Sequence, residues 1–169
     1  VDCGITSVAE VVHANTLGID VIVTDHHQPP PQEIPPAFAL INPKMPDSLY
    51  PFDGLAGIGL AFKFAQAILI RQNKLDDSAL PPFIISQLDL VALGTVVDMV
   101  PLVGENRILT RIGLSVLNQR ERPGIRALCR VSNLDRDEEL DGYALGFKLG
   151  PRINAAGRMD TAQKVIELM

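Results

Sequence analysis

The stretch that most constrains this chain is residues 21–27, which read Val-Ile-Val-Thr-Asp-His-His and are soon followed by three consecutive prolines at 29–31. An apolar, mostly β-branched run favours a buried parallel strand, and such strands present functional groups at their carboxyl ends. The prolines prevent the strand from continuing and a helix from starting at once. Asp25, His26 and His27 are therefore predicted at a sheet edge, either as part of a divalent-metal site or as turn and loop residues.

The composition is that of a globular chain without a disulfide framework. At 169 residues, with 47% hydrophobic content and a mean hydropathy of +0.19, the chain can bury one sizeable core. No apolar stretch reaches the roughly 18 to 20 residues that cross a membrane, and no signal or transit peptide is visible at the start. Cys3 and Cys129 are too few for a disulfide framework, so a reducing cytoplasm is the expected location.

The net charge of −5 is carried by the first half of the chain. Residues 1–84 contain 4 basic and 9 acidic side chains, whereas residues 85–169 contain 11 of each. Within the second half, seven arginines in residues 107–136 are accompanied by only two acids, Glu121 and Asp135. An acidic pole beside an arginine-rich segment suits a metal-dependent enzyme acting on polyphosphate, but a solvated surface with ordinary ion pairs is the simpler explanation.

The first residues of the chain lead to the same sheet edge. They read as a strand end, a tight turn and a helix start, with Ser7 and Glu10 as a capping box and Gly18 as the helix stop. Together with the strand at 21–24, they predict a right-handed βαβ unit with parallel strands. If these strands are neighbours, Asp2 lies beside the Asp-His-His segment, at the rim where such sheets place their ligands.

The remaining pattern predicts one more strand and several helices. The strand is expected at 38–41, and a helix that runs to about residue 72 follows the glycine-rich segment 53–59. The small residues of that segment allow a neighbour or a phosphate to come close, with close packing as the simpler explanation. Further helices are expected at 106–119 and 123–131. The predicted fold class is α/β, a parallel β-sheet flanked by helices with a mainly helical C-terminal half.

Asp98 is an acid in an unfavourable position. A helix predicted to begin at Pro81-Pro82 ends at Asp98, because Pro101 follows. A carboxylate at a helix C-terminus is opposed by the helix dipole by about 0.3–1 kcal/mol, and burial in its apolar surroundings would cost more. A bound cation would remove both penalties. A hydrogen-bonded acid in a turn is the alternative.

The segment Gly-Pro-Arg-Ile-Asn-Ala-Ala-Gly-Arg at 150–158 combines two arginines and an amide with small residues. The planar guanidinium group matches phosphate oxygens, and glycine and alanine allow close approach. The segment is therefore predicted to be a phosphate-binding loop, stiffened by Pro151, rather than a plain basic loop.

Five segments occur in an order that is informative as a set. They are Val-Asp-Cys-Gly at 1–4, Thr-Asp-His-His-Gln at 24–28, Leu-Ala-Gly-Ile-Gly-Leu-Ala-Phe-Lys at 55–63, Ala-Leu-Gly-Thr-Val-Val-Asp-Met-Val-Pro-Leu at 92–102 and the segment at 150–158. Together they resemble the DHH phosphoesterase superfamily and, within it, the RecJ-type single-stranded-DNA exonucleases. Asp-His-His marks the wider superfamily, and the last three segments point to the RecJ branch.

This resemblance implies a two-metal phosphodiesterase that uses Mn²⁺ or Mg²⁺ to hydrolyse single-stranded DNA in the 5′→3′ direction, in repair and recombination. Asp2 resembles the carboxylate that bridges the two ions, and His26 and Asp98 resemble ligands of one ion. Asp25 and His27 match the catalytic signature, where orientation of the ligands and contact with the reacting phosphate are expected. By the same resemblance, the group that binds the substrate phosphates comprises Arg152, Asn154 and Arg158.

The resemblance also sets expectations for the rest of the protein. Residues 1–160 are expected to form a DHH domain that lacks its N-terminal side, including an Asp-x-Asp motif on a preceding strand. Residues 161–169 are expected to begin a helix that leads to a further domain. Single-stranded-DNA-binding protein and a helicase are the implied protein partners, with no membrane involved. The alternatives are a DHH phosphodiesterase acting on short oligonucleotides, cyclic dinucleotides or pyrophosphate, and a non-catalytic replication scaffold.

Overall fold

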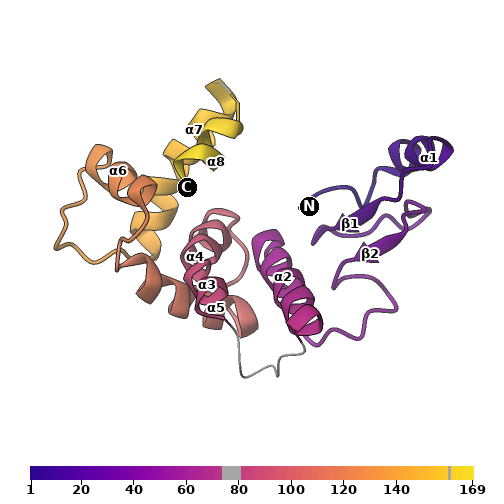
Figure 1. Ribbon diagram of the computed structural model, residues 1–169, viewed down its shortest axis with the longest axis horizontal. Coiled ribbons are helices and arrows are strands. Elements are labelled where there is room, and N and C mark those ends of the chain that lie inside the picture. The colour runs from indigo at the N-terminus through magenta and orange to yellow at the C-terminus, as the bar shows by residue number, and fades with distance from the viewer. Residues whose placement is uncertain (74–80, 160) are drawn as a thin grey trace. The chain divides into compact units, whose positions relative to one another are not determined.

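The computed structural model describes residues 1–73, 81–159 and 161–169 (Figure 1). The chain divides into two compact units, each described here by itself. The first unit comprises Val1–Leu80 together with Val103–Asn106, and the second comprises Pro81–Leu102 together with Arg107–Met169. The first unit holds the strands, and the second is helical in the part of the chain that the structure describes.

The sheet of the first unit has two strands, β1 (Ile22–Thr24) and β2 (Ala39–Ile41). They pair in parallel, with Val23 opposite Leu40. The first residues of the chain do not form the expected strand. They are linked to β1 by one backbone hydrogen bond, which the Asp2 N–H donates to the Thr24 carbonyl at 2.7 Å. The carboxyl end of β1 is thereby joined to the segment that carries Asp2, as the predicted βαβ arrangement requires.

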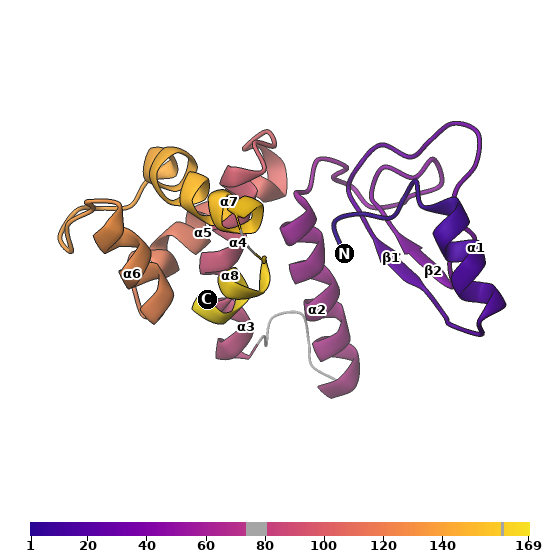
Figure 2. The same cartoon turned by 90° about the horizontal axis from the view of Figure 1, so that it is seen from above.

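Two helices flank this sheet, α1 (Val8–Thr16) and α2 (Gly57–Asn73). Figure 2 shows the strands between them. Helix α1 ends before Gly18, whose φ of +71° is the left-handed conformation predicted for a helix stop. The predicted capping box was wrong: Ser7 is the N-cap residue, but its side chain makes no capping hydrogen bond. Its ψ of 57° departs from the extended conformation in which a cap hydroxyl accepts an amide of the first turn.

The second unit is built from seven helical segments within the described residues. They are α3 (Pro82–Ser86), α4 (Leu88–Val97), α5 (Gly104–Leu117, whose first turn belongs to the first unit), α6 (Pro123–Val131), the π-helix η1 (Ala144–Leu149), α7 (Gly150–Met159) and α8 (Gln163–Leu168). Their apolar faces form one core, which includes Leu93, Leu117, Ile125, Leu145 and Leu149. The predicted α/β class, with a parallel sheet flanked by helices and a mainly helical second half, is confirmed.

The predicted helix from Pro82 to Asp98 was wrong in one respect, because it is broken at Gln87 into α3 and α4. The Ser86 hydroxyl donates to the Phe83 carbonyl at 2.7 Å, and the Gln87 side-chain amide donates to the same carbonyl at 3.1 Å. Side chains that bond nearby carbonyls compete with the regular helical ladder. Two short helices therefore replace one long helix.

The segment at 150–158 was predicted to be a loop, and this prediction was wrong. It forms α7, which continues directly from η1. Gly150 keeps helical angles, φ −54° and ψ −48°, so the helical backbone passes from η1 into α7 without a loop. Ala155 and Ala156, which the prediction used as small residues, are also strong helix formers. The two arginines of this segment are thus presented from a helix.

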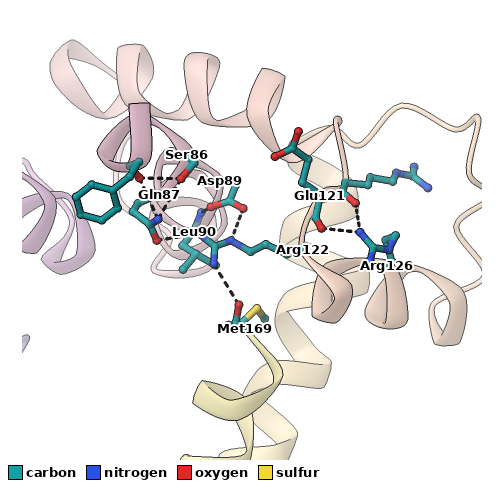
Figure 3. A network of polar contacts seen from close by, with 10 residues as sticks. Ser86, Gln87, Asp89, Leu90, Glu121, Arg122, Arg126 and Met169 are labelled. Carbon is teal, nitrogen blue, oxygen red and sulfur yellow. Dashed lines mark hydrogen bonds and ion pairs between the residues drawn. The ribbon is translucent and has the colours of Figure 1, made fainter. Parts of the chain in front are cut away.

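A partly buried ionic network ties the two ends of the second unit together (Figure 3). The Arg122 guanidinium donates through Nε to the Asp89 carboxylate at 2.5 Å, through Nη2 to the Gln87 side-chain oxygen at 2.8 Å and through Nη1 to the Met169 carbonyl at 3.1 Å. Asp89 is buried. Close by, Gly124 packs so tightly on the Leu168 carbonyl that a side chain at position 124 would overlap it. Arg122 therefore connects α4 and α6 with the end of α8.

Two further arginines of the second unit bond main-chain carbonyls. Arg120 donates to the carbonyls of Asp135 and Glu138, and Arg126 donates to those of Arg120 and Glu121. A groove of about 660 Å³ beside α5 is lined by Arg107, Arg111, Arg120 and Arg136 together with Asp137, Glu138, Glu139 and Asp141. The four arginines and four acids of this lining have formal charges that cancel. No described helix is long and apolar enough to cross a membrane.

Candidate metal centre

Asp25 organises the polar groups that follow β1. Its side chain is 1% exposed. Oδ1 accepts the backbone N–H groups of His26 at 2.8 Å and His27 at 3.1 Å, and it accepts Nδ1–H of His27 at 2.7 Å. Oδ2 accepts the Ile5 N–H at 2.9 Å. Burial raises the pKa of the Asp25 carboxyl, but these hydrogen bonds outweigh it and bring the pKa below its usual value. Asp25 is therefore an ionised carboxylate that orients both histidines.

The imidazole of His26 is held in one orientation. Nδ1 lies 3.1 Å from the Leu55 carbonyl oxygen, and because a carbonyl only accepts, Nδ1 carries a proton and donates it. In the neutral ring, Nε2 then directs a lone pair at Asp2 Oδ1, which is 3.2 Å away. Two acceptors at this distance repel each other unless a proton or a metal ion lies between them. An imidazole fixed through one nitrogen by a carbonyl is the usual arrangement of a metal-binding histidine.

Asp2 is positioned by contacts with the end of β1 and with the start of α2. Its N–H donates to the Thr24 carbonyl, and its φ of +62° is the left-handed conformation, which aspartate and asparagine adopt more readily than other non-glycine residues. Gly57, at the start of α2, packs directly on the Asp2 carboxylate, so that a Cβ at position 57 would overlap Oδ1. The carboxylate thus lies where the Thr24 carbonyl and the glycine of α2 hold it.

His27 completes the cluster. Within the described residues, Asp2, His26 and His27 each offer one ligand atom, and these atoms all lie within 4.8 Å of one another. The rings of His26 and His27 meet edge to face, with centroids 4.6 Å apart. The His27 carbonyl accepts the Asn42 side-chain amide at 2.9 Å, which fastens the residue to the end of β2. A carboxylate with two imidazoles is a donor set that fits a divalent transition-metal ion.

A model of the DHH family, N-terminal domain, matches residues 1–95 of this chain. The chain belongs to the DHH family. Among the curated DHH-family relatives, the Salmonella typhimurium single-stranded-DNA-specific exonuclease RecJ is 49% identical over 174 aligned residues, which cover 100% of this chain and 30% of that protein. The Bacillus subtilis protein of the same name is 43% identical and is matched over 100% of this chain and 20% of its own length. The chain thus spans about 30% or less of these relatives.

Solved structures of the family agree with this assignment. The crystal structure of Thermus thermophilus RecJ in complex with Mn²⁺ matches 99% of this chain and 24% of that one, with a TM-score of 0.79 and 34% identity. A crystal structure of exonuclease RecJ bound to manganese matches 97% of this chain and 39% of that one, with a TM-score of 0.77 and 35% identity. The resemblance to the RecJ branch is therefore confirmed in both sequence and fold.

The other predicted site residues lie in the second unit. Asp98 is the C-cap residue of α4, and its amide donates to the Gly94 carbonyl at 2.8 Å. Its assignment as a ligand beside Asp2 and His26 remains a prediction. The exposed side chains of α7 include those of Asn154 and Arg158. Arg152 donates to the carbonyls of Lys148 at 2.7 Å and Val131 at 3.3 Å. Asp160, an acid close to Arg158 in the sequence, lies outside the described residues.

Leu55, Gly57 and Asn42 support the site and were not predicted from the sequence. The glycine-rich segment had been interpreted as a place of close approach, and the group that approaches is the Asp2 carboxylate. Leu55 acts through its backbone carbonyl, so its side chain type carried no signal. Asn42 follows an apolar strand in the same way as Asp25, and that position at the end of β2 was an available signal.

Proposed function

We propose that this chain is the central part of a metal-dependent exonuclease that hydrolyses single-stranded DNA in the 5′→3′ direction, in DNA repair and recombination. The observation that carries the proposal is the orientation of the His26 ring. Its Nδ1 is hydrogen-bonded to the Leu55 carbonyl, and its Nε2 faces Asp2 Oδ1. This arrangement is built to share a cation, and it occurs in a chain that resembles DNA exonucleases over its whole length.

The cofactor of the proposed reaction is Mn²⁺ or Mg²⁺. Asp2 and His26 would hold it, with Asp98 as a further ligand. When bound, two such ions lower the pKa of a shared water and stabilise charge on the attacking and leaving oxygens of the phosphodiester. Asp25 keeps His27 oriented through its hydrogen bond to Nδ1, which leaves the other ring nitrogen for contact with the reacting phosphate.

Substrate binding is assigned to α7. The Arg152, Asn154 and Arg158 side chains would contact the phosphates of the strand. The two bonds that Arg152 makes to carbonyls use two of its five N–H groups and hold the guanidinium in place. A guanidinium that is already ordered loses less conformational freedom when it binds phosphate.

Membership of the DHH family supports four further proposals, on domain bounds, downstream structure, partners and location. We place residues 1–160 in the DHH domain and 161–169 at the start of a helix that leads to a further domain. Single-stranded-DNA-binding protein and a helicase are proposed as partners, and the cytoplasm as the location. Because this chain spans about 30% or less of its curated relatives, these assignments concern a protein larger than the described chain.

The proposal is tested by Mn²⁺ binding and by nuclease activity. In calorimetry, the 169-residue chain should bind Mn²⁺ weakly, His26→Ala should abolish this binding, and the matched control His13→Ala, at an exposed position of α1, should leave it unchanged. The longer protein should release mononucleotides from long single strands, whereas the 169-residue chain should show negligible hydrolysis. Hydrolysis of short oligonucleotides or cyclic dinucleotides alone would contradict the proposed substrate.

A further inference from the structure

Two aromatic side chains of the second unit are stacked on each other in solvent. The rings of Tyr143 and Phe147 have centroids 5.0 Å apart and planes inclined by 26°. Tyr143 is 62% exposed and Phe147 is 70% exposed. Single exposed apolar residues are common on protein surfaces, but a stacked aromatic pair is a larger apolar surface with open ring faces.

The backbone beneath this pair is fixed. Phe147 lies within η1, and the buried residues of η1, Leu145 and Leu149, belong to the core of the unit. The first turn is capped by the Asp141 carboxylate, which accepts the Ala144 N–H at 2.8 Å. π-helical segments are rare and are frequently found at functional sites. The two rings are therefore held on a rigid base and not on a mobile loop.

The charge around the pair is positive on the side of α7. Residues 142–158 contain three basic side chains and no acidic one. Lys148 is ion-paired to Glu138 at 3.4 Å, so the positive charge of this segment rests on Arg152 and Arg158. The Arg152 guanidinium bonds the carbonyl of Lys148, the residue that directly follows Phe147. Exposed positions continue along α7 to Asn154 and Arg158. Open ring faces are thus followed along one helical segment by groups suited to phosphate.

We propose that Tyr143 and Phe147 form a stacking platform for a base of single-stranded DNA, whose neighbouring phosphates are contacted by Arg152 and Arg158. This inference rests on the proposed function and adds the element that recognises the base. Stacking on aromatic rings accepts any base, because every base has a π face. In a duplex each internal base is covered on both faces by its neighbours. A platform that needs an open base face therefore favours single strands over duplex.

The test uses the longer protein and fluorescence anisotropy of a labelled single-stranded oligonucleotide, in EDTA so that the strand is not hydrolysed. Phe147→Leu should weaken binding by about 5- to 10-fold, at the lower end of the range for base stacking on an exposed ring. Phe147→Tyr should restore most of the affinity. The matched control Phe83→Leu changes an aromatic residue that is also exposed and should have no effect.

A second measurement needs no protein variant to establish which base is bound. Abasic sites introduced one at a time should reveal one or two positions where the wild-type protein loses affinity. In the Phe147→Leu variant, those abasic sites should reduce the DNA affinity little further, because the substitution has already removed the contact between ring and base. Equal affinity of Phe147→Leu and wild type, or full additivity at every position, would overturn the platform while leaving the proposed function intact. No binding of the wild type to any single strand would instead overturn the proposed function itself.

Discussion

Each unit has a charged side chain at the centre of a polar network, and the two networks end on different kinds of atoms. In the first unit Asp25 receives four hydrogen bonds, and the histidines that it orients form a cluster with the exposed Asp2. In the second unit Arg122 bonds Asp89, Gln87 and a main-chain carbonyl, and these contacts join α4, α6 and α8. Both networks centre on a charged side chain, but Asp25 is a buried acid and Arg122 is a half-buried base. What distinguishes a site from a structural tie is whether the network ends on atoms that a ligand can reach.

The same distinction separates structural arginines from arginines that a substrate can reach in residues 107–136. Of the seven arginines in this segment, Arg120, Arg122 and Arg126 bond carbonyl groups or Asp89. Arginine is suited to both tasks, because its planar fork matches phosphate and also spans two carbonyls. Charge counted along a sequence therefore overstates the charge that is available to a substrate.

The largest effect is expected from Arg122→Ala. The substitution leaves the Asp89 carboxylate buried without its partner, and breaking a buried pair in this way costs about 3–5 kcal/mol. The free energy of unfolding, measured with urea, should fall by this amount, and Mn²⁺ affinity in the folded protein should not change. Arg130→Ala, at an exposed position of α6, is the control and should stay within about 0.5 kcal/mol of wild type. A stable Arg122→Ala protein with weakened DNA binding would reverse the roles assigned to the two networks.

The next effect concerns the first unit and should appear in binding instead of stability. Gly57→Ala inserts a methyl group where the Asp2 carboxylate lies, so the carboxylate must turn away from His26. Displacing a group that supports a ligand typically costs 10–100-fold in metal affinity. Calorimetric titration with Mn²⁺ should show a loss in this range. Gly142→Ala is the control, since a Cβ at position 142 meets no atom within 4 Å. Unchanged Mn²⁺ affinity of the Gly57→Ala variant would contradict the role of the Asp2 carboxylate as a metal ligand.

Much of the fold could be predicted from local patterns. The strand that ends at Thr24, the stop at Gly18 and the helix from Pro123 to Val131 each carry a signal within a few residues, such as β-branching, a left-handed glycine or an N-terminal proline. The helix break at Gln87 and the helical form of 150–158 depend on which carbonyl a side chain finds and on the preceding π-helix. Individual side-chain hydrogen bonds and the geometry of an adjoining helix leave no periodic trace in a single sequence.

The site was only partly predictable for a related reason. Asp2, His26 and His27 were predicted at one sheet edge because the carboxyl ends of parallel strands meet there, and the structure places them together. Two residues that support the site do not act through a side chain. Leu55 acts through its backbone carbonyl, and Gly57 acts by having no Cβ. The sequence shows that residue 57 is small. It cannot show which carboxylate the small residue accommodates.

The smallest effect concerns two left-handed residues that follow a helix. Met99 has φ +59° after the Asp98 cap of α4, and Asn133 has φ +52° after the Ser132 cap of α6. In the first unit the left-handed residue is the candidate ligand Asp2 itself, whereas in the second it follows the candidate ligand Asp98. The Met99 side chain is 87% exposed, so that its replacement removes little packing. Met99→Gly should relieve about 1–2 kcal/mol of backbone strain and lose about 0.5–1 kcal/mol to the greater freedom of unfolded glycine, a net gain of about 0–1.5 kcal/mol.

Asn133→Gly is the matched control, because asparagine tolerates the left-handed region and should gain nothing. Urea unfolding of both variants measures the difference directly. If the Met99 conformation serves only to end α4, Met99→Gly should raise stability and leave Mn²⁺ affinity of the longer protein unchanged. Should the gain in stability come with a loss of Mn²⁺ affinity, the strained turn would be what aims Asp98. The second unit would then also contain a network that ends on a ligand atom.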